Sequence, residues 1–119
     1  MIGVPPRLRD YLQHIVDAIG RIYGYVAAVD HATFMGDAKT QDAVIRNLQI
    51  IGEAANNIRR RFPEVVAADP SVPWQSAYGM RNALTHGYFS VDLERVWTTI
   101  QNDLRPFEAT LRRLRASLR

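Results

Sequence analysis

The chain has 119 residues, no cysteine and a formal net charge of +3, and 47% of its residues are hydrophobic. Without cysteine, neither a disulfide nor a thiolate metal site can form. The N-terminus lacks the charged-then-apolar pattern of a signal peptide, and no apolar run approaches the roughly 20 residues of a membrane span. We therefore expect one domain over residues 1–119, located in the cytoplasm.

The basic residues are unusual in kind, since fourteen of the fifteen are arginine and only Lys39 is lysine. They cluster at residues 59–61 and in the last helix end, about residues 105–119. Guanidinium groups match phosphate geometry, so these clusters fit a nucleic acid or another acidic partner. A coding bias toward arginine and ordinary solvated helix ends explain the same pattern, and the composition leaves both interpretations open.

The first expected helix runs from about residue 7 to residue 31. Pro5 and Pro6 suit a helix start, and the apolar residues behind them are spaced alternately four and three apart: Leu8, Leu12, Ile15, Ile19, Ile22, Val26 and Val29. Gly20 and Gly24 weaken this helix by roughly 1 kcal/mol each relative to alanine. Because they are four residues apart, the alternative is that they allow another helix to approach closely.

A second helix is expected after a turn at residues 35–37, with Asp37 or Thr40 as its cap. Its apolar stripe has the same spacing: Val44, Leu48, Ile51, Ala55, Ile58 and Phe62. Pro63 ends this helix, because the residue before a proline disfavours the helical conformation. Residues 63–73 are expected to form a connection with one short turn at residues 64–68.

The third helix is short and is expected to begin at Trp74 and to end before Gly87, with Ala77, Met80 and Leu84 facing inward. The fourth begins after Ser90, a good capping residue, and its stripe consists of Leu93, Trp97, Ile100, Leu104, Phe107, Leu111, Leu114 and Leu118. Pro106 lies inside this stripe and should kink the helix.

Four helices with short connections predict an all-α fold, an antiparallel four-helix bundle with a short third helix. The stripes are nearly perfect heptads, and the last one stays apolar to the end of the chain. This apparent surplus of apolar surface favours a homodimer; the alternative is a monomer that uses all of it internally.

Residues 80–89 gather more chemically capable side chains than any other part of the chain, namely Arg81, Asn82, His86 and Tyr88. Cleavage of RNA requires a group that takes the proton from the 2′-hydroxyl, a group that protonates the leaving oxygen, and positive charge beside the phosphorane. Histidine can serve either proton role, and arginine makes a permanent contact with phosphate. Arg81 and His86 are therefore sufficient for this chemistry without a metal ion.

Helix geometry restricts how these residues meet. Positions five apart lie about 140° apart around an ideal helix, so Arg81 and His86 do not share a face, whereas Asn82 and His86, four apart, do. Either Arg81 reaches around the helix, or the helix unwinds before Gly87, or two subunits combine their residues across a dimer cleft. We favour the dimer cleft.

A purely structural interpretation of the same residues also stands. His86 could cap the carbonyl groups at the helix end, Arg81 could pair with Glu53 or Asp92, and Tyr88 could be half-buried. Elsewhere, His14 lies at helical spacing from two aspartates; we expect an exposed polar pair there and no metal site. His31, beside Asp30, is expected to cap the end of the first helix.

The stretch 80–89 resembles the Arg-x4-His-x-Tyr signature of HepT-type toxins, the ribonuclease half of HEPN/MNT toxin–antitoxin pairs. Residues 41–48 and 50–54 resemble the second helix of that family, residues 73–74 its entry to the third helix, and residues 91–92 and 96–97 its last helix. The similarity covers roughly residues 8–107. Residues 75–78 and Ala83 depart from the family pattern, so substrate contacts beside the signature are expected to differ.

The resemblance implies an all-α HEPN bundle that forms a homodimer and acts as a metal-independent endoribonuclease with no cofactor. Arg81 and His86 match the catalytic pair and Asn82 the polar position between them, while Arg46 and Glu53 are weaker candidates for site support. Tyr88 matches the tyrosine to which the partner nucleotidyltransferase, the MNT antitoxin, transfers AMP. The rival hypotheses are a non-catalytic helical module that binds nucleotide or a partner protein beside a nucleotidyltransferase, and a plain dimeric structural protein.

Overall fold

The computed structural model describes residues 6–85 and 91–118; for residues 6 and 81–85 it describes the backbone but not the side chains. All regular structure in these ranges is helical, which confirms the all-α class. The helices are α1 (Pro6–Val26), α2 (His31–Met35), α3 (Ala38–Arg61), α4 (Pro63–Ala68), α5 (Trp74–Thr85), α6 (Leu93–Asn102) and α7 (Leu104–Ser117).

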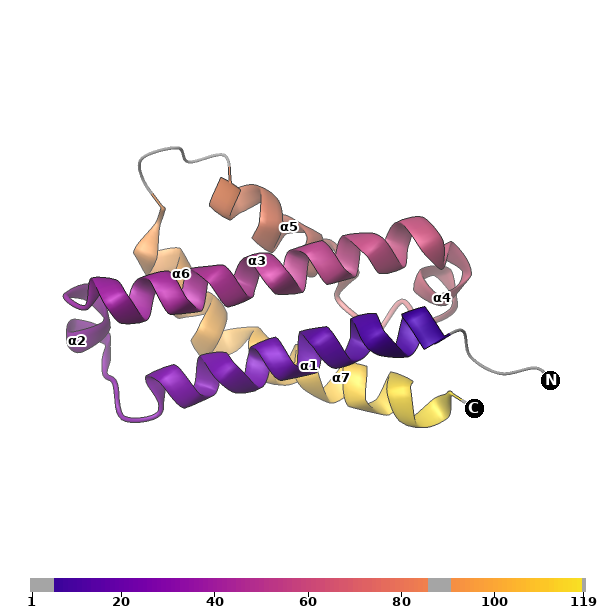
Figure 1. The fold of residues 1–119 in the computed structure, drawn as a ribbon, viewed down its shortest axis with the longest axis horizontal. Coiled ribbons are helices and arrows are strands. Elements are labelled where there is room, and N and C mark those ends of the chain that lie inside the picture. Colours follow the sequence, from indigo (N-terminus) through magenta and orange to yellow (C-terminus); the bar gives the residue numbers. More distant parts are fainter. Residues whose placement is uncertain (1–5, 86–90, 119) are drawn as a thin grey trace.

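The two longest helices, α1 and α3, lie side by side and antiparallel along the length of the molecule (Figure 1). Helices α6 and α7 follow one another across the back of this pair, and α7 packs on α1. Helix α5 packs on α3 at the side away from α1, and the short helices α2 and α4 lie at opposite ends. The four expected helical segments are therefore present, with two short helices added at the ends of the bundle. None of the described helices is long and apolar enough to cross a membrane.

The predicted apolar stripes form one continuous core. Buried residues of this core come from α1, α2, α3, α5, α6 and α7, and the largest that are fully buried are Leu12, Ile15, Ile19, Ile22, Phe34, Leu48, Ile51, Ile58, Ile100, Leu104, Phe107 and Leu111. Among the described residues, Tyr25 is the one large hydrophobic side chain classed as exposed, at 40%. Other stripe members, among them Trp97, Leu114 and Leu118, are only partly buried, so the surplus of apolar surface and the homodimer inferred from it stay predictions.

The first helix ends at Val26, earlier than the predicted residue 31. Asp30 starts α2 instead, because its side chain accepts a hydrogen bond from the backbone N–H of Thr33 at 2.8 Å. Such a cap offers the backbone an alternative to continued helix. Hydrogen bonds from Thr33 also lower the pKa of Asp30 below its ordinary value. His31 is consequently the first residue of α2, and its predicted role as a cap of the first helix was wrong.

The second predicted helix corresponds to α3 and begins as expected after Asp37. The Asp37 carboxylate accepts hydrogen bonds from the backbone N–H of Thr40 at 3.2 Å and from its hydroxyl at 2.6 Å, and these bonds lower the pKa of Asp37. Of the two cap candidates, Asp37 is thus the cap. The helix ends at Arg61, and Pro63 opens the six-residue helix α4, which lies where a short turn was predicted at residues 64–68.

The last predicted helix is divided into α6 and α7 at Asp103, three residues before Pro106. A proline ring clashes with the carbonyl group four residues earlier, so its effect falls on the preceding turn. Tyr23 of α1 secures this junction: its hydroxyl donates to the carbonyl oxygen of Ile100 at 3.0 Å, and the Arg105 guanidinium lies 3.7 Å from its ring centroid. Burial raises the pKa of Tyr23 above its ordinary value.

The cap of α6 and the surroundings of two glycines in α1 also differ from what the sequence predicted. Asp92 caps α6 by accepting a hydrogen bond from the backbone N–H of Arg95 at 3.1 Å, whereas the predicted cap, Ser90, lies outside the described residues. A Cβ atom added at Gly20 or Gly24 would meet nothing within 4 Å. Within the described ranges no helix approaches α1 closely at these glycines, so the close approach allowed by that alternative is not present there.

Candidate active site

Helix α5 carries the first part of the signature and is fixed on the core by its inward face. Trp74, Ala77 and Met80 are buried, as predicted for the last two. The helix continues without interruption through Arg81 and Asn82 to Thr85, the residue before His86. Unwinding between Arg81 and Thr85 is thereby excluded as the way in which Arg81 and His86 would meet.

The chemistry-bearing atoms themselves lie beyond what the structure describes. The side chains of Arg81 and Asn82, and the whole of His86 and Tyr88, lie outside the described residues. The assignment of Arg81 and His86 as catalytic, of Asn82 as support and of Tyr88 as a modification site therefore stays a prediction.

The two support candidates on α3 lie in a groove between α1 and α3. Arg46 and Glu53 are exposed and seven residues apart, and they line a hollow of about 460 Å³ with Tyr11 and His14 of α1. The groove is completed by Gln49, Ile50, Ala54 and Asn57, and no described residue of α5 lines it. The predicted support role of Arg46 and Glu53 is not decided by this placement and stays a prediction.

A second hollow, which we call the α5–α6 cleft, adjoins the signature more directly. It has a volume of about 340 Å³ and is lined by Leu48 of α3, by Gln75, Ser76, Gly79 and Met80 of α5, by Asp92, Arg95, Val96 and Thr99 at α6, and by Asp103. Two of its lining residues, Met80 and Asp92, border residues 81–91 along the chain. The sequence had drawn attention to Asp92 as a pairing candidate, but Arg95 and Asp103 were not singled out, because only the packing of α6 behind α3 brings them to α5.

The histidines outside the signature have structural surroundings. The His31 Nε2 lies 2.8 Å from Glu94 Oε1, and its ring meets that of Trp97 edge-on with centroids 5.8 Å apart, so this pair joins α2 to α6. His14 makes an edge contact with Tyr11, at a centroid distance of 6.4 Å. Within residues 6–85 and 91–118, side chains included where described, no group of three or more potential metal ligands occurs.

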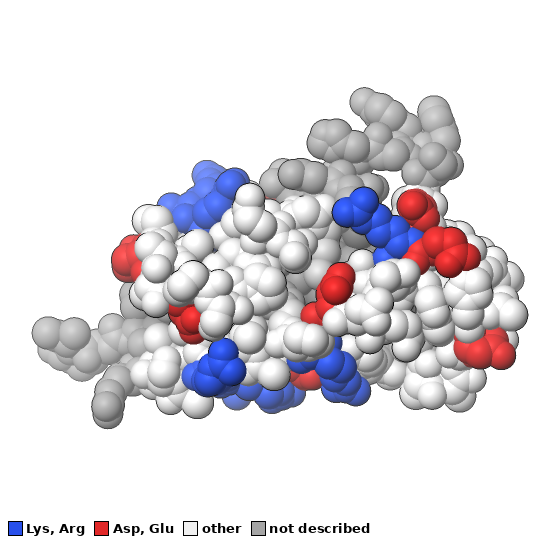
Figure 2. Space-filling view, turned by 180° about the vertical axis from the view of Figure 1, so that it is seen from behind, with Lys and Arg blue, Asp and Glu red and all other residues white. Residues whose placement is uncertain are grey.

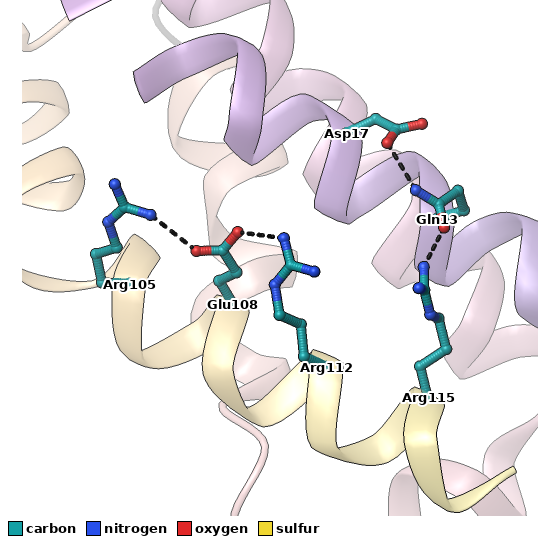
Figure 3. A network of polar contacts seen from close by, with 6 residues as sticks. All are labelled: Gln13, Asp17, Arg105, Glu108, Arg112 and Arg115. Atoms are coloured by element: carbon teal, nitrogen blue, oxygen red, sulfur yellow. Dashed lines mark hydrogen bonds and ion pairs between the residues drawn. The ribbon is translucent and has the colours of Figure 1, made fainter. Parts of the chain in front are cut away.

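Most of the clustered arginines are engaged with neighbours on the surface. Glu108 accepts hydrogen bonds from Arg105 at 3.1 Å and from Arg112 at 3.0 Å, while Arg115 donates to Gln13, which itself donates to Asp17 (Figure 3). On the face seen in Figure 2, basic and acidic groups alternate and no broad area carries a single sign. The arginine content by itself thus does not produce a large basic face there.

Comparison with known proteins identifies the family. The family model described as "Ribonuclease HepT-like" matches residues 15–114, from the middle of α1 to the last turns of α7. The chain belongs to the HepT-like family. The match includes the whole of α5, the signature and the α5–α6 cleft.

Several curated proteins resemble this HepT-like chain over most of their length. The "Probable ribonuclease HepT" of Thermococcus cleftensis is 38% identical over 107 residues, which cover 90% of this chain and 94% of that protein. "Putative RNase TTE0752" of Caldanaerobacter subterraneus is 32% identical, with coverage of 89% and 92%. "Putative RNase MJ1380" of Methanocaldococcus jannaschii is also 32% identical, with coverage of 82% and 86%. No solved structure gives a significant match.

Proposed function

We propose that this HepT-like chain is a metal-independent endoribonuclease in which Arg81 and His86 cleave RNA. The observation that carries the proposal is the family match over residues 15–114, which includes the Arg-x4-His-x-Tyr signature. The architecture supports it, since α5 is anchored by buried Trp74 and Met80, and its backbone is helical over Trp74–Thr85, a range that includes Arg81. A reactive side chain carried on a helix is positioned more precisely than one on a free loop.

The proposed division of labour follows from the chemistry of the side chains. Arg81 neutralises charge that develops on the phosphorane, for which a permanently charged, bidentate donor is suited. His86 transfers protons, and a position next to a helix C-terminus favours its imidazolium form. His86 is therefore the proposed acid that protonates the leaving oxygen. Asn82, Arg46 and Glu53 enter the proposal as residues that support the site.

Two alanine variants test this function. We expect Arg81→Ala and His86→Ala each to lower the rate of RNA cleavage by about 10²-fold or more, because removing a proton-transfer or charge-stabilising group costs about that much. The measurement is the cleavage rate of a fluorogenic RNA, with circular dichroism to establish that the helices persist. Arg60→Ala, at an exposed arginine that lines neither hollow, is the matched control.

The outcome of this experiment also separates the rival hypotheses. If His86→Ala cleaves RNA at the rate of the unsubstituted protein, the catalytic assignment is wrong. If the unsubstituted protein itself cleaves no RNA, the non-catalytic helical module becomes the better hypothesis.

We further propose that the chain is the toxin of a cytoplasmic HEPN/MNT pair and that its nucleotidyltransferase antitoxin silences it by transferring AMP to Tyr88. The resemblance of Tyr88 to the tyrosine of the signature supports this proposal. Its physical reason is that an adenylyl group adds a negatively charged phosphate next to residues that must bind the phosphate of RNA. Substrate would then be repelled and excluded.

Substitution of the tyrosine tests the silencing step. We expect Tyr88→Phe to inhibit growth as strongly as the unsubstituted toxin but to resist the antitoxin, because only the hydroxyl that accepts AMP is lost. Intact-mass measurement after co-expression with the nucleotidyltransferase checks the modification directly. Absence of the added AMP mass on the unsubstituted toxin would disprove the proposed modification.

A further inference from the structure

The α5–α6 cleft contains polar side chains that nothing else in the described chain engages. Gln75, Ser76, the Arg95 guanidinium and the Asp103 carboxylate line the cleft, and none of these side chains has a hydrogen bond or an ion pair within the part of the chain that the structure describes. Asp103 precedes α7 but makes no side-chain cap. These groups are therefore available to an occupant of the cleft.

The cleft also has an apolar floor. Leu48, Met80 and Val96 line it and are buried, so an occupant would rest on hydrocarbon below and meet polar groups around it. A concave apolar surface with a few converging polar groups is the usual form of a site for a small ring or a cofactor. A volume of about 340 Å³ lies at the small end of such sites, which are about 300–1,000 Å³.

The charges of the residues that line the cleft favour a base of RNA over a phosphate group as its occupant. The described lining holds two carboxylates, Asp92 and Asp103, and one guanidinium, Arg95, so this part of the cleft carries a net negative charge and does not suit a phosphate in its interior. Carboxylates accept hydrogen bonds from N–H groups, and among the bases guanine presents a ring N–H and an exocyclic amino group side by side. Asp103 can accept both in the bidentate manner in which carboxylates receive paired donors.

We propose that the α5–α6 cleft is a guanine-binding pocket, with Asp103 as the residue that selects the base. The inference rests on the proposed function for its ligand, an RNA base next to the cleavage site, because Met80 of the cleft directly precedes Arg81 in α5. Leu48, Met80 and Val96 support the base, Asp103 receives its N–H donors, and Arg95 contacts the adjoining phosphate at the rim.

A substitution at Gly79 tests whether the cleft is the site. Gly79 lines the cleft, and a Cβ atom added there would meet none of the described residues within 4 Å, so Gly79→Leu can place a side chain in the hollow. Leucine also favours a helix more than glycine does. Gly20→Leu is the matched control, because Gly20 is likewise helical with open space at its Cβ but lies on α1, outside the cleft.

The measurement is the binding of fluorescein-labelled oligoribonucleotides to the full chain carrying His86→Ala, so that cleavage does not intervene. We expect an oligonucleotide with one guanosine among uridines to bind about tenfold more tightly than the all-uridine oligonucleotide, since one base contact of this kind typically changes affinity by that factor or more. Gly79→Leu should abolish this preference and Gly20→Leu should preserve it. Equal binding of the two oligonucleotides, or a preference that survives Gly79→Leu, would overturn the proposal.

A second variant tests the role of the carboxylate. Asp103→Asn keeps the size of the side chain and removes one acceptor, so the preference for guanosine should fall about tenfold, while Asp10→Asn, an exposed aspartate on α1, should leave it unchanged. An unchanged preference in Asp103→Asn would reject this residue as the selector of the base.

Competition with GMP distinguishes the two sources of a guanine base. If GMP displaces the oligonucleotide at similar concentrations, the cleft binds a free nucleotide; if only the oligonucleotide competes, it binds RNA. Because binding is measured without cleavage, failure of the unsubstituted protein to cleave RNA would overturn the proposed function alone.

Discussion

A single buried side chain, that of Asn47, connects helices α1 and α3 by hydrogen bonding. It is the one polar side chain among the described residues that is buried, with 4% of its surface exposed. Its Nδ2 donates to the carbonyl oxygen of Ala43 at 2.9 Å, and its Oδ1 accepts from the Arg21 Nε at 2.8 Å. Both ends of the amide are therefore satisfied, and the bond to Arg21 links α3 to α1.

We expect Asn47→Ala to lower the free energy of unfolding by about 1–3 kcal/mol, because it removes a partly buried hydrogen bond to a charged group and leaves a small void. Asn57→Ala is a matched control: Asn57 Nδ2 donates in the same way to the carbonyl oxygen four residues earlier, that of Glu53, but this bond is exposed and lies within α3. Its effect should stay within about 0.5 kcal/mol. Urea unfolding of the three proteins checks both values, and equal losses would show that the Arg21 bond contributes nothing.

The most specific functional prediction from the sequence, the assignment of site residues, rested on a few individual residues. Arg81, His86 and Tyr88 stand out in the sequence by their types and spacing, whereas the lining of the α5–α6 cleft did not. Arg95 lies on the exposed surface of α6 and Asp103 at the junction between α6 and α7, and only the tertiary packing brings both to the cleft beside α5. Residues adjacent in the chain can be recognised as a group, but residues joined only by packing cannot.

At the level of helices, the stripes on α1 and α3 predicted their position well because one buried face with helical spacing leaves few alternatives. The ends were predicted less well. Asp30 and Asp92 each cap the helix that follows them, which fixes where α2 and α6 begin. Pro106 interrupts the last predicted helix about one turn before the proline itself, at Asp103. Which of several possible caps is used depends on the direction that the chain must take afterwards.

The exposed glycines of α1 give a test at this level. We expect Gly20→Ala and Gly24→Ala each to raise the free energy of unfolding by about 0.5–1 kcal/mol, because alanine favours a helix and its Cβ meets nothing within 4 Å. Thermal unfolding should show an increase in Tm of a few degrees for each variant. A decrease would indicate that this face of α1 packs against another surface in solution, such as a second copy of the chain.

For the whole molecule, the open question is whether two copies of the chain combine. Trp97, Leu114 and Leu118 of the stripes are only partly buried, so the dimer stays a prediction, and the 140° offset between Arg81 and His86 on an ideal helix favours it. Helix α5 runs unbroken through Thr85, so that offset holds along its described length up to the residue before His86. A site shared between subunits remains our explanation for how the two residues act together.

Mixing two inactive proteins tests this arrangement. We expect Arg81→Ala and His86→Ala to be inactive separately and to recover part of the activity when they are refolded together, because a mixed dimer rebuilds one site from the intact residue of each subunit. RNA cleavage by the mixture, together with sedimentation of the unsubstituted protein, measures this. A mixture that stays inactive, or a chain that sediments as a monomer, would contradict the shared site.

The sequence by itself determined the all-α class, the positions of the main helices and the family signature, since helical periodicity and adjacent reactive residues are local properties of the chain. Only the tertiary structure decided that no described residue closely approaches α1 at Gly20 and Gly24, which members of the apolar stripes are fully buried, and that Arg46 and Glu53 line the α1–α3 groove. It also created the α5–α6 cleft, whose residues come from three helices. These features depend on distances between segments far apart in the chain, which local pattern does not specify.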